Sequence, residues 1–297
     1  QVTAQDVWVN VLPCYHVGGL SVGARAFIGN NAVYEFSGKW DPQRFKVHLQ
    51  NHKATLTSIV PTQLFDLVKA NIRTSKYLRA VFVGGGHLSK ELYFAARALG
   101  WPVLITYGLS EAGSQVATNS LQSLQEDTYP QLEILPHVEV QADQEGCLAI
   151  KGTSLFSQYA VMKGGGYVSI DPKQNGWFQT DDLGTVVNNK FLQMNGRRGD
   201  AVKIAGHLVN LTRQQELWES VTNDSQSVIV ATPDVRLQNQ LVLVSSGQLL
   251  EVCALVEKYN ERAGGSEKVR AVYQVHSVAR SELGKVKKQE VMGLLGF

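Results

Sequence analysis

Apolar runs alternate with amphipathic stretches through the first third of the chain. Runs bounded by proline, glycine or polar residues predict buried strands at residues 7–12, 56–60, 78–83 and 103–106. Between them, the helical spacing of apolar residues predicts helices at residues 41–52, 61–71 and 89–99. Since strands alternate with helices, the pattern predicts βαβ units in a mostly parallel sheet, and therefore the α/β class.

The pattern changes twice further along the chain. Shorter segments predict strands at residues 132–135, 138–141 and 147–151, which indicates a small antiparallel, barrel-like β subdomain. Later segments predict strands at residues 227–231, 241–245 and 272–278 and a helix at residues 249–263, which together indicate a small α+β domain. We therefore predict three parts, at residues 1–128, 129–195 and 196–297, with the last boundary in the polar stretch 195–200.

The composition narrows the classes of protein. Hydrophobic residues make up 44% and charged residues 18% of the 297 residues, which predicts a soluble globular protein. The net charge of +2 does not favour binding to nucleic acid or to a membrane. No apolar run approaches the roughly 20 residues that span a bilayer, and no signal peptide is recognisable.

The cysteines and the first residue add two expectations. Cys14, Cys147 and Cys253 lie far apart and form neither a disulfide framework nor a CxxC site, so we expect a reducing, bacterial cytoplasm. The chain begins with Gln1 and reaches a predicted strand within a few residues. We therefore expect it to be a piece of a longer protein.

The string YGLSE, residues 107–111, directly follows a predicted strand. The ring of Tyr107 can stack on a base, Ser110 offers a hydroxyl to a phosphate, and Glu111 is an oxygen ligand suited to Mg²⁺. Ligands bind at the carboxyl ends of strands in open α/β sheets. Taken alone, the string fits an ordinary turn with a solvated glutamate equally well.

Three further segments carry charged residues in chemically suggestive settings. A carboxylate in GWFQTDDLG, residues 176–184, would accept hydrogen bonds from ribose hydroxyls. Arg197 in GRRGD would bridge ribose and phosphate. Lys285 in SELGKVKK would bridge a carboxylate and a phosphate. The simpler interpretations are an acidic turn, a solvated basic linker and a basic tail. For each segment alone, the simpler interpretation is favoured.

In this order, the segments resemble motifs of the adenylate-forming superfamily of acyl-CoA synthetases, luciferases and peptide-synthetase adenylation domains. The family's Y-G-x-T-E is matched at residues 107–111 with Ser110 for threonine, and its T-G-D at residues 180–182 with Asp181 for glycine. Its G-R-x-D-D is matched at residues 196–200, with Gly199 in place of the hinge aspartate. Its terminal G-K is matched at residues 284–285, and its glycine-rich strand end at residues 84–87.

The resemblance implies roles for individual residues and a set of substrates. Glu111 would hold the metal and Lys285 would catalyse adenylation. Hinge residues would be Gly199 and Asp200, and the CoA-side loop would include Lys203 and Gly206. Nucleotide binding would fall to Gly84, Gly85, Gly86, Tyr107, Gly108, Ser110, Asp182 and Arg197. The implied substrates and metal are ATP, coenzyme A and Mg²⁺, without a prosthetic group.

The resemblance also implies how the three parts work together. Residues 1–128 would belong to a large adenylation domain that is incomplete at its N-terminus, because nothing matches the family's phosphate loop. Residues 196–297 would be a mobile lid that rotates about residues 196–200. The partners would then be an acid, ATP, CoA and the N-terminal segment of the same enzyme, with a homodimer possible.

The segment LPCYHVGGLSVGARAF, residues 12–27, bears on the acid. LPxxHxxG recurs in acyl- and aryl-CoA synthetases, and an arginine at the position of Arg25 resembles the o-succinylbenzoate–CoA ligases of menaquinone biosynthesis. A dicarboxylate substrate keeps one carboxylate, whose burial requires a cation. The residues that would contact the acid are His16, Arg25, Ser114, Gln115 and Thr118.

Other interpretations remain open at the level of sequence. Arg25 also fits a surface position on an amphipathic helix, and His16 also fits a core position. The enzyme could be another acyl- or aryl-CoA synthetase, or an adenylation domain that loads a carrier protein. A non-catalytic, nucleotide-binding fragment is the third alternative.

Overall fold

The chain divides into two compact units in the computed structural model, which describes residues 2–205, 207–281 and 285–296. The first unit contains residues 1–180 and 184–194, and the second contains residues 181–183 and 195–297. Each unit has its own buried apolar cluster and is described by itself.

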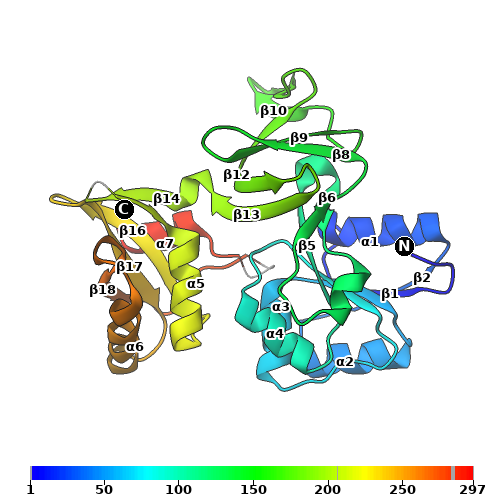
Figure 1. The fold of residues 1–297 in the computed structure, drawn as a ribbon, viewed down its shortest axis with the longest axis horizontal. Helices are drawn as coiled ribbons and strands as arrows, with labels where there is room; N and C mark the ends of the chain where they lie inside the picture. The colour runs from blue at the N-terminus through cyan, green and yellow to red at the C-terminus, as the bar shows by residue number, and fades with distance from the viewer. Residues whose placement is uncertain (1, 206, 282–284, 297) are drawn as a thin grey trace. The chain divides into compact units, whose positions relative to one another are not determined.

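A large mixed sheet organises the first unit (Figure 1). Its parallel part has the order β2-β1-β3-β4-β5, followed by the antiparallel strand β6. These strands are β1 (Val7–Asn10), β2 (Ala32–Glu35), β3 (Leu56–Ile59), β4 (Ala80–Val83), β5 (Val103–Leu109) and β6 (Ser114–Thr118). The predicted parallel βαβ core is therefore confirmed.

Helices cover both faces of the parallel strands. The helices are α1 (Val17–Gly29), α2 (Pro42–Asn51), α3 (Pro61–Lys69) and α4 (Lys90–Ala98). Phe45, Leu64 and Tyr93, one from each of α2 to α4, pack in one cluster, while Val22 and Ala26 of α1 pack with Trp8 in another cluster on the opposite face (Figure 1). The opposite faces follow from the alternation of side chains along each strand.

The predicted β subdomain continues the same sheet instead of forming a separate one. The order after β6 is β7-β13-β12-β9-β8. These strands are β7 (Leu132–Ile134), β8 (Val138–Ala142), β9 (Cys147–Gly152), β12 (Phe178–Val187) and β13 (Phe191–Arg197). A separate hairpin of β10 (Tyr159–Lys163) and β11 (Gly166–Ile170), which was not predicted, exposes every one of its strand residues.

The second unit is an α+β structure, as predicted. Its three-stranded sheet has the order β16-β17-β18, and β14 pairs with β15. The strands are β14 (Ala201–Ile204), β15 (His207–Asn210), β16 (Val228–Asp234), β17 (Gln238–Ser245) and β18 (Val269–Gln274), and the helices are α5 (Leu211–Thr222), α6 (Leu249–Arg262) and α7 (Lys288–Leu294). Trp218 of α5 and Tyr259 of α6 are fully buried in its main cluster. Short 3-10 helices are η1 (Ser110–Ala112) and η2 (Leu121–Gln125) in the first unit and η3 (Arg198–Asp200) and η4 (Gly265–Glu267) in the second.

Two predicted segments differ from the structure. The last strand was predicted at residues 272–278 but lies at Val269–Gln274, because parallel pairing with β17 begins at Val269. Val275 and Val278 pack against an apolar cluster instead of extending the strand. The polar stretch 195–200, in which we placed the last boundary, differs in its first half, since β13 continues as far as Arg197.

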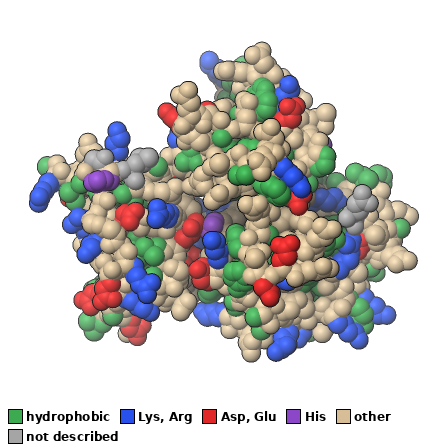
Figure 2. Space-filling view, viewed as in Figure 1, with side chains coloured by type: hydrophobic (Ala, Val, Ile, Leu, Met, Phe, Trp, Pro, Cys, Tyr) green, Lys and Arg blue, Asp and Glu red, His purple; other side chains and the backbone are tan. Residues whose placement is uncertain are grey.

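The surface agrees with the nearly neutral composition. Acidic and basic side chains are interspersed over the face of each unit that Figure 2 shows. Among the described residues, no helix has the length and apolar character needed to cross a membrane.

Candidate active site

Arg25 lies at the centre of a polar cluster between α1 and β6. Its Nη1 donates to Ser21 Oγ at 3.1 Å, and its Nη2 donates to Ser114 Oγ at 3.3 Å and to Gln115 Oε1 at 3.0 Å. Ser21 lies one helical turn before Arg25, which brings both side chains to the same face of α1. The structure therefore brings together three of the five residues predicted to contact the acid and adds Ser21.

The electrostatic setting of Arg25 is unusual. Burial lowers the pKa of its guanidinium, and the residue is only half-exposed. Among the residues that the structure describes, the recorded acceptors of its hydrogen bonds are all uncharged oxygens. An arginine remains protonated in such a setting, so this cluster holds a positive charge ready for an anion.

Two other residues predicted to contact the acid lie apart from these contacts. Thr118 donates its hydroxyl to the backbone oxygen of Ile105 at 3.0 Å, so its hydrogen bond goes to β5. His16 is the exposed N-cap residue of α1, makes no capping hydrogen bond with its side chain, and lies beside the ring of Tyr15 at 4.8 Å. The alternative of a buried core histidine is therefore wrong for His16.

The predicted glycine run adjoins the Arg25 cluster through Thr106. A Cβ added to Gly84 would lie 2.6 Å from Thr106 Cγ2, so only glycine allows this approach. Gly85 has a φ of 78°, which favours glycine, and Gly86 is exposed. Thr106 Oγ1 accepts a hydrogen bond from Gln115 Nε2 at 2.9 Å. The glycine run, Thr106 and Gln115 therefore form one continuous wall.

Gly108 has a packing role that the sequence did not reveal. A Cβ at this position would lie 1.7 Å from the backbone oxygen of Ser114, and the β5–β6 pairing shifts register between Tyr107 and Gly108. Tyr107 is half-buried and packs against two apolar clusters. Pairing with β6 carries β5 past the predicted end at residue 106, and the register shift lies within this extension.

Glu111 lies in η1, directly after β5. Its Oε1 accepts a hydrogen bond from Tyr159 Oη at 3.0 Å, and its backbone oxygen accepts one from the Phe156 amide at 2.8 Å. Burial raises the pKa of Tyr159, and the Glu111 carboxylate raises it further. Ser110 beside it is exposed. Tyr159, which sequence reasoning missed, orients the carboxylate from a strand 48 residues away.

The fit of Glu111 to Mg²⁺ follows from its single carboxylate. No group of three or more His, Cys, Asp or Glu side chains that could hold a metal occurs among the described residues. Magnesium that accompanies a nucleotide takes one or two protein carboxylates together with phosphate oxygens and water. One half-buried glutamate at a strand end meets that requirement.

In the second unit, Asp182 forms an ion pair with Arg197. Arg197 Nε lies 2.6 Å from Asp182 Oδ1, and the Asp182 side chain is 9% exposed, against 64% for Arg197. Thr180, Asp181 and Asp182 alternate between buried, exposed and buried positions along β12. Of the two aspartates, Asp182 is therefore the one held in a fixed place, as the T-G-D match implied.

Lys285 interacts electrostatically with the same pair. Burial of its ammonium group lowers the pKa of Lys285 and Arg197 lowers it further, while Asp182 acts in the opposite direction. The residue as a whole stays exposed, so this burial is partial. The pKa of Lys285 thus responds to Arg197 and Asp182, which lie 88 and 103 positions earlier in the sequence.

The remaining predicted residues lie in or near the segment that follows β13. Gly199 and Asp200 lie in η3, and a Cβ at Gly199 would meet no atom. Lys203 is exposed on β14, and its backbone oxygen accepts from Asn239 Nδ2 at 3.0 Å. Gly206 lies outside the described residues, as does Gly284 of the predicted G-K motif.

Comparison with known proteins identifies the family. A sequence model described as AMP-binding enzyme matches residues 1–160, which is more than half of the chain. The chain belongs to the AMP-binding enzyme family. The match covers Arg25, the glycine run and the YGLSE string, and the predicted superfamily is therefore confirmed.

Relatives of this AMP-binding enzyme include curated ligases. The chain is 23% identical to a 2-succinylbenzoate–CoA ligase of Enterococcus faecalis, over 98% of this chain and 62% of the relative. It is 28% identical to a ligase of the same name from Bacillus cytotoxicus, over 98% of this chain and 62% of the relative. The chain thus spans about 62% of the length of these relatives.

Solved structures show the same fold. The o-succinylbenzoate CoA synthetase of Bacillus subtilis in complex with its acyl-adenylate intermediate superposes with a TM-score of 0.83 at 22% identity, covering 98% of this chain and 61% of that one. The same enzyme with ATP and magnesium gives a TM-score of 0.79 at 21% identity, covering 98% and 62%. These likenesses confirm the predicted fold class.

Proposed function

We propose that this AMP-binding enzyme family member is an ATP-dependent acid–CoA ligase acting on 2-succinylbenzoate, a dicarboxylic acid of menaquinone biosynthesis. The observation that carries the proposal is Arg25, a half-buried cation whose hydrogen bonds go to Ser21, Ser114 and Gln115. A charge buried among neutral groups is costly unless an anion joins it. The carboxylate that does not react would be that anion. Relatives that carry the same substrate in their names support the choice.

Two half-reactions make up the proposed activity. In the first, a carboxylate oxygen of the acid attacks the α-phosphorus of ATP, and a phosphorus–oxygen bond forms as the bond to pyrophosphate breaks. In the second, the sulfur of coenzyme A attacks the acyl carbon, the thiol proton leaves to solvent, and the carbon–oxygen bond to AMP breaks. The products are the thioester and AMP.

Each of the predicted site residues has its own role in the first half-reaction. Glu111 binds the Mg²⁺ that accompanies ATP, and Lys285 stabilises the charge that moves between the acid and the α-phosphate. The glycines at 84–86 and Tyr107 bind the base, and Gly108 and Ser110 approach the phosphates. Asp182 accepts hydrogen bonds from the ribose hydroxyls, and Arg197 orients Asp182, as their ion pair at 2.6 Å supports.

Rotation of the C-terminal domain belongs to the same proposal. We retain the parts 1–128, 129–195 and 196–297, with the pivot at Gly199 and Asp200, where the backbone of Gly199 carries no steric restriction from a neighbour. After rotation, Lys203 and the CoA-side loop would serve the second half-reaction. A cytoplasmic location follows from the need for ATP and CoA.

Two measurements on the protein test this function. Calorimetry would measure binding of ATP and of a non-hydrolysable acyl-adenylate mimic, and pyrophosphate release would be compared for 2-succinylbenzoate and benzoate. We expect binding of both nucleotides and turnover with the dicarboxylate. Nucleotide binding without pyrophosphate release would support the non-catalytic, nucleotide-binding fragment, and preference for a pantetheinyl carrier protein over CoA would support a loading domain. Failure to bind either nucleotide would contradict the proposed function.

A further inference from the structure

Lys285 lies on one arm of a short hairpin, here named the lysine hairpin (residues 279–281 and 285–287). Arg280 and Val286 form an antiparallel bridge between its arms. The Ser281 amide donates to the Lys285 oxygen at 2.7 Å, and the Lys285 amide donates to Ser281 Oγ at 3.2 Å. The backbone of Lys285 is therefore fixed to the opposite arm, and its position depends on how the two arms are anchored.

The first arm is anchored on the body of the second unit. Arg280 Nη2 donates to the backbone oxygens of Ser225 at 2.9 Å and Gln226 at 3.3 Å, in the segment between α5 and β16. Ala279 packs against the apolar cluster that covers one face of the three-stranded sheet, and Val286 of the second arm packs against the same cluster. This arm has both polar and apolar restraints.

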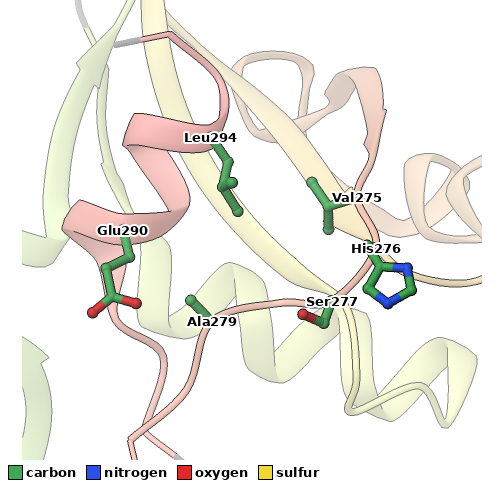
Figure 3. Close-up of a pocket in the computed structure, with 6 residues that line it drawn as sticks. All are labelled: Val275, His276, Ser277, Ala279, Glu290 and Leu294. Carbon is green, nitrogen blue, oxygen red and sulfur yellow. The ribbon is translucent and has the colours of Figure 1, made fainter.

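The second arm continues directly into α7, which is a weak anchor by itself. α7 has seven residues, and isolated helices of that length are not stable in water. Val291 is its one fully buried side chain. A cavity of about 350 Å³ lies beside α7, lined by Glu290 and Leu294 of the helix and by residues that follow β18 (Figure 3). Met292 packs against the same apolar cluster as Val291, so the apolar contacts of α7 begin at Val291 and its first residue, Lys288, is held by polar contacts.

Asp200 supplies a polar contact at the start of α7. Lys288, the first residue of α7, forms an ion pair with Asp200 Oδ1. Thr212 of α5 donates its hydroxyl to the other carboxylate oxygen at 2.8 Å. The Asp200 side chain is 19% exposed and that of Lys288 is 46% exposed. Asp200 thus links α5 to the start of α7. Lys288, the residue of α7 that it binds, lies three residues after Lys285.

We propose that Asp200 and Lys288 are positioning residues for adenylation, because their ion pair fixes the second arm of the lysine hairpin and so places Lys285. The inference deepens the proposed function and rests on the role given there to Lys285. All three residues lie within the second unit. Neither Asp200 nor Lys288 needs to contact the substrates for this role.

Four variants test the Asp200–Lys288 ion pair, here named the tether. Asp200→Asn and Lys288→Gln each remove one charge, and the amide oxygen introduced by Asp200→Asn can still accept the hydrogen bond from Thr212. The double variant Asp200→Lys with Lys288→Asp restores a pair of opposite sign. The matched control is Glu290→Gln, which removes the exposed Lys287–Glu290 pair at 2.7 Å on the same helix.

The first readout does not depend on activity. Hydrogen exchange of peptides covering residues 279–296 is measured by mass spectrometry. We expect exchange several-fold faster in Asp200→Asn and Lys288→Gln than in the parent or the control, and partial return in the charge-reversed double variant. Equal exchange in the tether variants and the control would overturn the tether itself, whether or not the protein is a ligase.

The second readout separates positioning from binding. For adenylation we expect kcat to fall about five- to tenfold in the tether variants with the KM for ATP unchanged, and thioester formation from preformed acyl-adenylate to stay near the parent rate. Faster exchange with unchanged adenylation kcat would overturn the positioning role. Absence of adenylation in the parent protein would count against the proposed function and leave the exchange result to decide the tether.

Discussion

The two cationic centres of the molecule are held in opposite ways. Arg25 lies on the thirteen-residue helix α1 and donates a hydrogen bond to Gln115 on a strand of the large sheet. The fully buried Val22 lies beside it on α1. Lys285 lies in a hairpin whose second arm is held by a half-exposed ion pair. Under the proposed function, the first centre would suit a group that persists through the reaction, namely the spare carboxylate. The second would suit a charge that is needed in one half-reaction and then leaves.

The largest expected effect comes from Lys285→Ala. Removing an ammonium aimed at developing charge should lower adenylation by about 10²- to 10³-fold, as measured by pyrophosphate release. Thioester formation from preformed acyl-adenylate should change far less. Lys287→Met, two positions away, is the matched control and should leave both rates close to the parent. Equal losses in the two half-reactions would remove Lys285 from its assigned role.

The next effect concerns Arg25. Arg25→Gln should lower kcat/KM for the dicarboxylic acid by about 10- to 100-fold, because a hydrogen-bonded charge pair contributes about 1.5–3 kcal/mol. Benzoate, which has no second carboxylate, should lose little. Thr118→Val is the control, since that hydroxyl donates to β5. A parallel loss for both acids would show that Arg25 supports the fold and not acid selection.

The third prediction concerns the contribution of the Asp6–Arg79 ion pair to the stability of the first unit. Asp6 is 3% exposed and lies 2.6 Å from Arg79. Burial acts to raise the pKa of Asp6, but hydrogen bonds from Arg79, the Thr3 amide and Thr55 outweigh it and hold the pKa well below its usual range. Asp6→Asn should therefore lower the free energy of unfolding by about 2 kcal/mol at neutral pH, which urea denaturation measures.

The pH dependence of that difference has a definite sign. A carboxyl whose folded pKa lies below its unfolded value stabilises the protein above the unfolded pKa, and this contribution disappears as the pH falls toward the folded pKa. The difference in free energy of unfolding between the parent and Asp6→Asn should thus have its maximum value above about pH 5 and shrink below about pH 4. A gap that stays constant into acid would show that the ion pair is not its source.

The smallest expected effect is on salt dependence. Raising the salt from about 0.1 M to about 1 M shortens the screening length from about 10 Å to about 3 Å. Hydrogen exchange in residues 285–296 should then increase about twofold, while β5 and β6 should not respond. An equal response of the two regions would contradict the contrast between a buried and an exposed anchor.

The sequence predicted the elements whose side chains repeat with a clear period. The strands β1 and β3 to β5 alternate with three helices whose apolar faces are evident, and the side chains of Asp41 and Ser89 cap two of these helices. The β10–β11 hairpin could not be predicted from a buried face, because all of its strand residues are exposed. The end of β18 depends on pairing with β17, which a local pattern does not encode.

The candidate site shows the same division. Arg25, Glu111, Asp182 and Lys285 were identified from residue type and resemblance. Ser21, Thr106 and Tyr159 were not, because their importance depends on contacts between different elements, such as those of Ser21 with Ser114, 93 positions away, and of Tyr159 with Glu111, 48 positions away. Gly108 was assigned to nucleotide binding, and the structure adds a steric reason that only tertiary contact reveals.

The steric constraint at Gly108 limits how this enzyme can change. Gly108 and Ser114 lie in close contact at the two ends of the short loop between β5 and β6. Glu111 lies at the tip of this loop, and Ser114 and Gln115 lie at its exit, where β6 begins. Under the proposed function, a substitution that reshapes the exit for a new acid would also shift the tip that carries Glu111, the carboxylate proposed to bind the metal. Acid preference and ATP affinity should therefore evolve together here, and engineering for a new acid should monitor both.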